Sequence, residues 1–219
     1  MVKIMRQASL QTTQRSSTRP ASRHSVSIAA ALLFVGSAML ALAVQDWRNL
    51  TIASILVVLS FAPLLAERWA GVKVPLSVQI LYVLLLLTAP YLGGYWRWYE
   101  IWQPWDTLVH FYSGIFISFA LIIALGKTLG AYRLVLPVWL EVVMLITAKA
   151  FIALLWEIGE FVFDLIFGTS TQADNLDTMT DMIAGLGPSL VVAALLHGHR
   201  QQGAFKYIGS LLDAGQGKL

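Results

Sequence analysis

The stretch LVHFYSGIFISFALIIAL, residues 108–125, is the segment that decides the fold class. It contains no Asp, Glu, Lys or Arg, and at about 1.5 Å per helical residue it is long enough to cross a hydrocarbon core of about 30 Å. Further apolar runs lie at residues 27–44, 50–66, 74–91, 134–167 and 176–196. The sequence therefore predicts an all-α, polytopic transmembrane bundle of about six helices.

The composition excludes an ordinary soluble domain. Of the 219 residues, 58% are hydrophobic and 12% are charged, with a mean hydropathy of +0.70. A soluble domain carries roughly twice this charged fraction. The chain has no cysteine, which excludes disulfides, thiolate metal ligands and cysteine nucleophiles. The basic residues lie in tails and short loops, so the net charge of +3 indicates membrane topology and not nucleic-acid binding.

The apolar runs divide the chain into three regions. Residues 1–26 are expected to form a flexible basic tail, residues 27–199 the six-helix transmembrane domain, and residues 200–219 a short cytoplasmic tail. The connections are short, so no separate soluble domain is expected. The run at 134–167 is too long for one perpendicular crossing, and we expect it to tilt, to kink near Pro137 or to continue beyond the lipid.

The distribution of basic residues predicts the orientation. Of the 15 Lys and Arg, only Arg48 and Arg97 fall on one side, while Lys149 lies inside a span; the other twelve share the opposite side. The positive-inside rule places that basic side, with both termini, in the cytoplasm. All acids except Glu67, Glu141 and Asp213 fall at or near the other, non-cytoplasmic face.

Three motifs bring reactive side chains to this acidic face. Each places its polar residues three or four positions apart, so that they share one side of a helix. The motifs comprise Asp106, His110 and Ser113 in the fourth span, Glu157, Glu160 and Asp164 in the fifth, and Asp177, Asp181 and Gly185 in the sixth.

Carboxylates gathered at one depth repel one another, and a divalent cation would relieve this repulsion. Oxygen ligands with one imidazole suit Mg, Mn, Fe, Ca or Zn. The predicted ligands are Asp106, His110, Glu157, Glu160, Asp177 and Asp181, and the candidate catalytic groups are Glu157, Glu160 and Asp181.

Some of these acids also have simpler interpretations. Asp106 and Asp177 both occupy expected helix N-cap positions, and Asp164 and Asp174 are expected to be solvated loop acids.

Two further features are open to two interpretations each. Lys149 lies near the middle of the fifth span, where a lysine is either functional or paired between helices. The aromatic loop at residues 95–105 is interpreted as an interfacial belt, with a substrate-stacking surface as the alternative.

The ordered motifs resemble a known group of membrane proteins. Trp105-Asp106 with His110-Phe111, then Trp156-Glu157 with Glu160-Phe161, then Asp177-Thr178 with Asp181 resemble the YjdF-type family of bacterial inner-membrane proteins, a domain of unknown function. More distantly, this order is similar to the VanZ-like family, which is linked to glycopeptide resistance and the cell envelope. The resemblance implies a six-helix membrane architecture and does not supply a reaction.

Three functions agree with these observations. The first is a metal-dependent enzyme on an amphiphilic or lipid-linked envelope substrate in the bilayer. The second is a transporter or ion- or proton-coupled binder that uses Lys149 as a relay. The third is a non-catalytic accessory subunit with membrane-protein partners. No feature of the sequence predicts a nucleic-acid partner.

Overall fold

The computed structural model describes residues 24–218, and all regular secondary structure in this range is helical. It contains six helical stretches long and apolar enough to cross a membrane, which confirms the predicted fold class. The stretches are α3 (Ser25–Ala43), α4 with α5 (Trp47–Leu59 and Ala62–Ala70), α6 with η1 (Leu76–Leu86 and Leu87–Tyr95), α8 (Trp105–Tyr132), α9 (Val138–Phe167) and α10 (Asn175–Gln202). Nearly all of the predicted tail at residues 1–26 lies outside the described residues.

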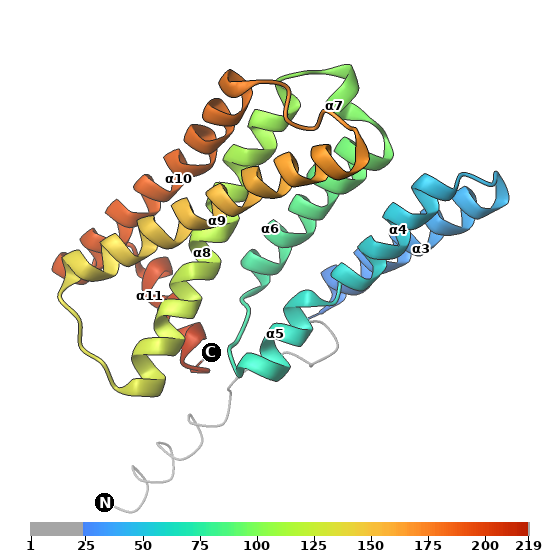
Figure 1. Cartoon of the computed structure of the whole chain (residues 1–219). Helices are drawn as coiled ribbons and strands as arrows, with labels where there is room; N and C mark the ends of the chain where they lie inside the picture. Colours follow the sequence, from blue (N-terminus) through green and yellow to red (C-terminus); the bar gives the residue numbers. More distant parts are fainter. Residues whose placement is uncertain (1–23, 219) are drawn as a thin grey trace, which may run out of the picture.

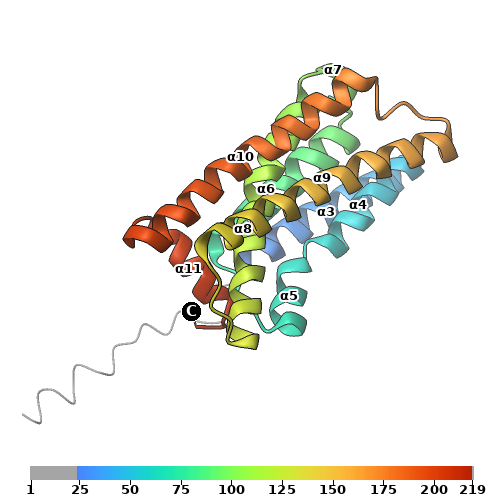
Figure 2. The same cartoon turned by 60° about the vertical axis from the view of Figure 1, so that its left-hand side comes forward.

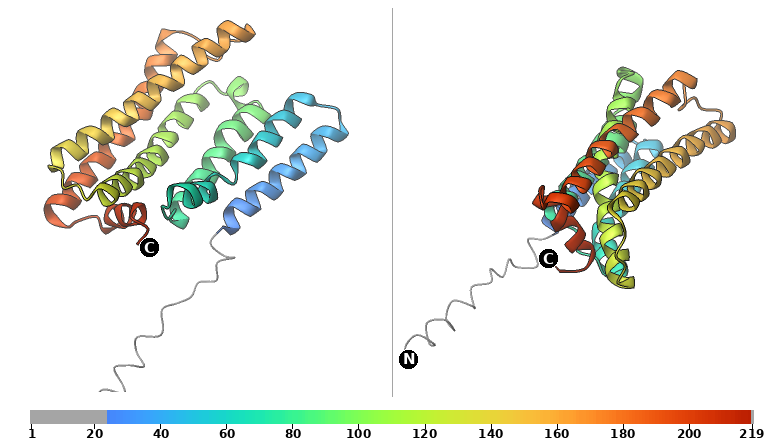
Figure 3. Two further views of the ribbon diagram at one scale, coloured as in Figure 1. Left: turned by 60° about the horizontal axis from the view of Figure 1, so that its bottom comes forward. Right: turned by 90° about the vertical axis from the view of Figure 1, so that its left-hand side faces the viewer.

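The helices form two groups on either side of α6. The α3–α4 hairpin packs against α6 and η1 on one side, while α8, α9 and α10 form the other (Figures 1 and 3). The most extensive helix contacts join α8 to α10 and α3 to α4, followed equally by α10 to α9 and α8 to the C-terminal helix α11 (Lys206–Gly215). Two main clusters of buried apolar residues match this division, one centred on Phe34 and Leu56 and the other on Ile122 and Leu196.

The long fifth run forms a single helix whose ends have local causes. Helix α9 begins after Pro137, which fixes its own φ and donates no backbone N–H, and ends at Gly168 in the left-handed conformation. The kink expected near Pro137 is therefore a helix start. Its 30 residues span about 45 Å at 1.5 Å per residue, more than the hydrocarbon core requires. Figure 2 shows α9 running obliquely across α8.

The C-terminal segment, expected to be a short tail, contains a packed helix. Helix α11 (Lys206–Gly215) buries Ile208, Leu211 and Leu212 against α8. Glycines permit this contact, because a Cβ at Gly126 would collide with the backbone of Leu212. The amphipathic pattern of α11 was present in the sequence but was too short to be recognised among the membrane spans.

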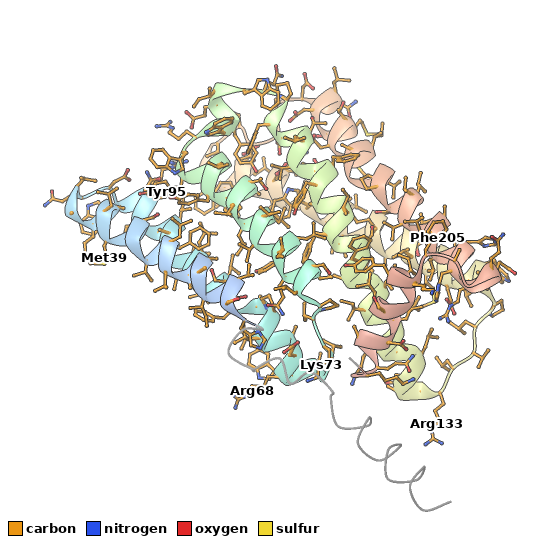
Figure 4. All side chains as sticks on the ribbon, turned by 180° about the vertical axis from the view of Figure 1, so that it is seen from behind. Met39, Arg68, Lys73, Tyr95, Arg133 and Phe205 are labelled. Carbon is orange, nitrogen blue, oxygen red and sulfur yellow. The ribbon has the colours of Figure 1, made fainter. Side chains whose placement is uncertain are left out.

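The two ends of the bundle differ in charge. Arg68, Lys73 and Arg133 lie at the end that also carries α11 (Figure 4). The short helix α7 (Trp98–Ile101) lies at the opposite end, between η1 and α8 (Figure 1). This separation agrees with the grouping of basic residues on which the predicted orientation depends; the orientation itself stays a prediction.

Helices α8 and α10 approach each other most closely where two glycines meet. A Cβ added at Gly114 would collide with the carbonyl oxygen of Gly185, so Gly114 has no room for a side chain against the facing backbone. One turn further along, Ser118 Oγ donates a hydrogen bond to Ser189 Oγ at 2.8 Å, and both serines are fully buried. Small residues at a close crossing are a common basis of helix association in membranes.

We expect Gly114→Ala to destabilise the protein, because its methyl group cannot be accommodated without separating α8 from α10. Overpacking of this kind costs on the order of 1–3 kcal/mol. The change should lower the midpoint of thermal unfolding in detergent. Gly187→Ala is the matched control on α10, since a Cβ there meets no atom within 4 Å. Equal midpoints for the two variants would contradict the close crossing.

Candidate functional site

Helix α8 brings an aspartate and a histidine together at the α7 end of the bundle. Asp106 and His110 are four residues apart, and Asp106 Oδ1 lies 3.5 Å from His110 Nε2. The N-cap of α8 is Pro104, and Asp106 stands in the first helical turn. The predicted capping role of Asp106 is therefore wrong, and its carboxylate faces the imidazole instead.

The start of α10 is capped by a different residue than expected. Asp174 is the N-cap, and its side chain accepts a hydrogen bond from the backbone N–H of Asp177 at 2.9 Å. Asp177 in turn accepts one from the N–H of Ala173 at 3.0 Å. The two aspartates together cap the start of α10, in an arrangement similar to a capping box. The N-cap position predicted for Asp177 therefore belongs to Asp174, an exposed loop acid that also caps the helix.

Helix α9 supplies the second carboxylate that contacts the imidazole. Glu157 Oε1 lies 3.9 Å from His110 Nδ1, on the side of the ring opposite Asp106. Glu157 is only 5% exposed, and its other oxygen accepts a hydrogen bond from Gln172 at 3.5 Å. The imidazole of His110 therefore lies between two carboxylates from two different helices.

Asp181 on α10 completes the cluster. Asp106, His110 and Asp181 each offer one ligand atom, and these three atoms lie within 4.8 Å of one another. Asp181 is 2% exposed and forms a hydrogen bond with the hydroxyl of Thr107. We call Asp106, His110, Glu157 and Asp181 the acid–histidine site.

Two oxygens of the acid–histidine site have no hydrogen-bond partner among the described residues. They are Glu157 Oε1 and Asp181 Oδ1, and both are buried. A buried polar atom without a partner costs about 1–3 kcal/mol, and more when it is charged. These oxygens face a region already crowded with carboxylates, so the arrangement would gain free energy from a bound cation.

Three further residues that the sequence singled out, Glu160, Ser113 and Asp164, have hydrogen-bond partners outside the acid–histidine site or within their own helix. Glu160 accepts a hydrogen bond from Trp156 Nε1 at 2.7 Å and interacts electrostatically with Asp106. Ser113 donates to the carbonyl oxygen of His110 at 2.8 Å. Asp164, interpreted from the sequence as a solvated acid, organises the loop after α9, where its oxygens accept hydrogen bonds from Thr169, Thr171 and Gln172.

Lys149 lies deeper in the bundle and is 2% exposed. Its Nζ is 3.0 Å from the position that a Cβ on Gly185 would occupy, so the missing side chain of that glycine leaves room for the ammonium group. Within the described part of the chain, no carboxylate oxygen lies within 4.0 Å of this nitrogen. Lys149 interacts electrostatically with His110, which links it to the acid–histidine site.

Sequence reasoning missed two residues at the site. Thr107 immediately follows Asp106, yet its value as a partner for Asp181 depends on how α8 and α10 pack. Tyr99 belongs to the aromatic loop that was interpreted as an interfacial belt, but it interacts electrostatically with Asp106 and Asp181. Tyr99 is 38% exposed, yet desolvation of its hydroxyl, together with these carboxylates, raises the pKa of Tyr99, so the phenol stays protonated.

The aromatic loop is only partly a surface feature. Tyr95 and Trp105 are each 7% exposed, and the indole of Trp105 donates a hydrogen bond to the carbonyl oxygen of Thr88. Trp98 and Trp102 are exposed and pack against the ring of Trp105. The loop therefore closes the α7 end of the bundle above the acid–histidine site.

The arrangement has the features of a cation site in a helical bundle. Carboxylates and one imidazole converge from three helices, as in metal sites built between facing helices. If His110 bound an ion through Nε2, its Nδ1–H would be free to donate to Glu157 Oε1, which is the usual way that a protein orients a metal-bound imidazole. The donor set is compatible with Mg²⁺, Mn²⁺, Fe²⁺ or Zn²⁺.

Comparison with known proteins identifies the family. No curated protein and no solved structure matches the chain significantly. The family model described as predicted membrane protein, DUF2238, matches residues 24–202, which include all six apolar helices and the acid–histidine site. The match confirms the predicted YjdF-type resemblance, whereas the distant VanZ-like similarity stays a prediction. The chain belongs to the DUF2238 family of predicted membrane proteins, the YjdF family.

Proposed function

We propose that this protein is a membrane-embedded enzyme that uses a divalent cation and acts on an amphiphilic or lipid-linked envelope substrate. One observation carries the proposal: two unpartnered carboxylate oxygens are buried beside an imidazole at the end of a helix bundle. Following the predicted orientation, this end faces the non-cytoplasmic side of a bacterial inner membrane.

The chain's own residues divide into three roles in this proposal. Asp106, His110 and Asp181 are the cation ligands, since their donor atoms converge. Glu157 would orient the imidazole from the other side, where its Oε1 lies 3.9 Å from His110 Nδ1, and Thr107 would orient Asp181. Ligands fixed by such partners bind the metal in a defined geometry.

In this proposal, two further groups would take part in proton transfer. Glu160 lies near Asp106 and is held by Trp156, and the protonated hydroxyl of Tyr99 lies above the same carboxylates. A divalent cation would polarise a phosphoryl or carbonyl oxygen or activate water. Glu160 would accept the proton from the attacking water, and Tyr99 would donate a hydrogen bond to the leaving oxygen.

The first test is the metal content of the protein purified in mild detergent. We expect a stoichiometric divalent ion by elemental analysis, and binding of Mn²⁺ to the metal-stripped protein by electron paramagnetic resonance. Asp181→Asn and His110→Ala should abolish this binding. Glu157→Gln should weaken it by about 10–100-fold, because it changes the partner of His110 and not a ligand.

Glu100→Gln is the control for these variants. Glu100 lies outside the membrane spans, and its side chain forms an exposed ion pair with Arg97 at 2.7 Å. The hydrogen bond from Arg97 lowers the pKa of Glu100, so this carboxylate is ionised at neutral pH but lies apart from the acid–histidine site. The Glu100→Gln variant should bind Mn²⁺ with the affinity of the wild type. A metal-free protein that stays folded and does not respond to chelators would refute the proposal.

Ion-coupled transport is a second candidate function, and the position of Lys149 favours it. Its ammonium group lies buried beneath the acid–histidine site, in contact with the Gly185 position of α10. A charged group at this depth is costly and commonly marks an ion or proton pathway. In this function the carboxylates would receive the ion and Lys149 would regulate its passage.

Flux through proteoliposomes separates the two functions. If the protein is a transporter, wild-type proteoliposomes should take up radioactive Mn²⁺, and Lys149→Met should abolish the uptake while leaving equilibrium Mn²⁺ binding measurable. Lys149→Arg, which keeps the charge, is the comparison variant. Binding without uptake in the wild type would exclude transport of this ion and favour the enzyme.

A further inference from the structure

A crevice of about 580 Å³ lies beside the acid–histidine site, between the first turns of α8 and α10. We call it the α8/α10 crevice and define it by Trp102, Thr107, Leu108, Phe111, Asp177 and Ala184. Its apolar walls include Leu108 and Phe111, which are 46% and 49% exposed. Because α8 and α10 are membrane-spanning helices, these exposed apolar walls are suited to contact with lipid chains.

The crevice and the acid–histidine site share a wall. Thr107 lines the crevice, and its hydroxyl forms a hydrogen bond with Asp181. A headgroup seated against Thr107 would thus be one residue away from the proposed cation ligands, while its chain would follow Leu108 and Phe111 into the bilayer. This geometry suits a substrate that enters sideways from the lipid.

The charges of the crevice select the headgroup. Asp174 and Asp177 line its polar end, and no Lys, Arg or His is present among the described residues that line it. Each carboxylate uses one oxygen in the helix cap, which leaves the other for a ligand. The exposed indole of Trp102 also lines the crevice and can bind a cation over its face. This end therefore complements a positive group and repels a bare anionic one.

We propose that the α8/α10 crevice binds a phospholipid whose headgroup carries an ammonium group, with the ammonium at Asp174 and Asp177 and the phosphate near Thr107. The inference rests on the proposed function, because it names the substrate class of that site. It assigns the crevice residues to recognition and leaves the acid–histidine site to the cation.

The test is lipid binding to the full chain in detergent, measured by native mass spectrometry with phosphatidylethanolamine and phosphatidylglycerol of the same acyl chains. We expect phosphatidylethanolamine to bind at least about ten-fold more tightly, a difference of about 1.4 kcal/mol. The double change Asp174→Asn with Asp177→Asn should remove this preference, since Asn retains helix capping but carries no charge.

A steric variant tests the place of binding. Ala184→Trp should fill the crevice and reduce phosphatidylethanolamine binding by at least about ten-fold. Ala124→Trp is the matched control, because Ala124 lines a separate cavity between α5, α6 and α8. The control should bind phosphatidylethanolamine as the wild type does.

Mn²⁺ binding measured on the same samples separates this inference from the proposed function. Ala184→Trp should keep the Mn²⁺ affinity of the wild type, because it does not alter a ligand. Equal binding of the two lipids, or binding unaffected by Ala184→Trp, overturns the lipid inference even if Mn²⁺ binds. Selective, crevice-dependent lipid binding without Mn²⁺ binding supports the lipid site and refutes the cation-dependent enzyme.

Discussion

The close contact between the backbones of α8 and α10 at Gly114 and Gly185 is the constraint on which the functional end of this protein depends. Because Gly114 has no side chain, the backbone of α8 meets that of α10 at Gly185, and this contact fixes the register of the two helices. One turn above the contact, that register brings His110 on α8 level with Asp181 on α10. It also leaves the space in which the ammonium group of Lys149 lies. Packing and chemistry are therefore determined by the same pair of glycines.

The acid–histidine site shows how a membrane bundle can keep charges in an apolar setting. Each of its acids would be costly alone in lipid. Grouping them at the end of three helices, under the aromatic loop that includes Trp102 and Trp105, keeps them close to the interface and to one another. Mutual repulsion between these carboxylates lowers the stability of the fold, but it also favours the binding of a cation. The two unpartnered oxygens of Glu157 and Asp181 have the same two effects.

Much of the architecture could be predicted from the sequence, because apolar runs and basic loops report directly on lipid contact. The six spans are confirmed, and the helical spacing correctly grouped Asp106 with His110. What the sequence could not provide was how the helices meet. Periodicity placed Ser113 on the face of His110, yet its hydroxyl is bonded within its own helix. Thr107 and Tyr99 acquire their partners only through packing between elements. The N-cap of α10 could not be identified from the sequence, because several acids precede the apolar run and the helix starts after Asp174.

The ion pair at the other end of the bundle has a consequence for biogenesis. Glu141, near the start of α9, is 3% exposed, and its carboxylate accepts a hydrogen bond from Arg200, near the end of α10, at 2.7 Å. A buried charge that loses its partner is costly, about 3–5 kcal/mol for a broken buried pair, so each of these two residues depends on the other. The pair therefore favours entry of α9 and α10 into the membrane as one unit. Such entry would assemble two of the three walls of the site, together with the loop that carries Asp164 and Asp174, in one step.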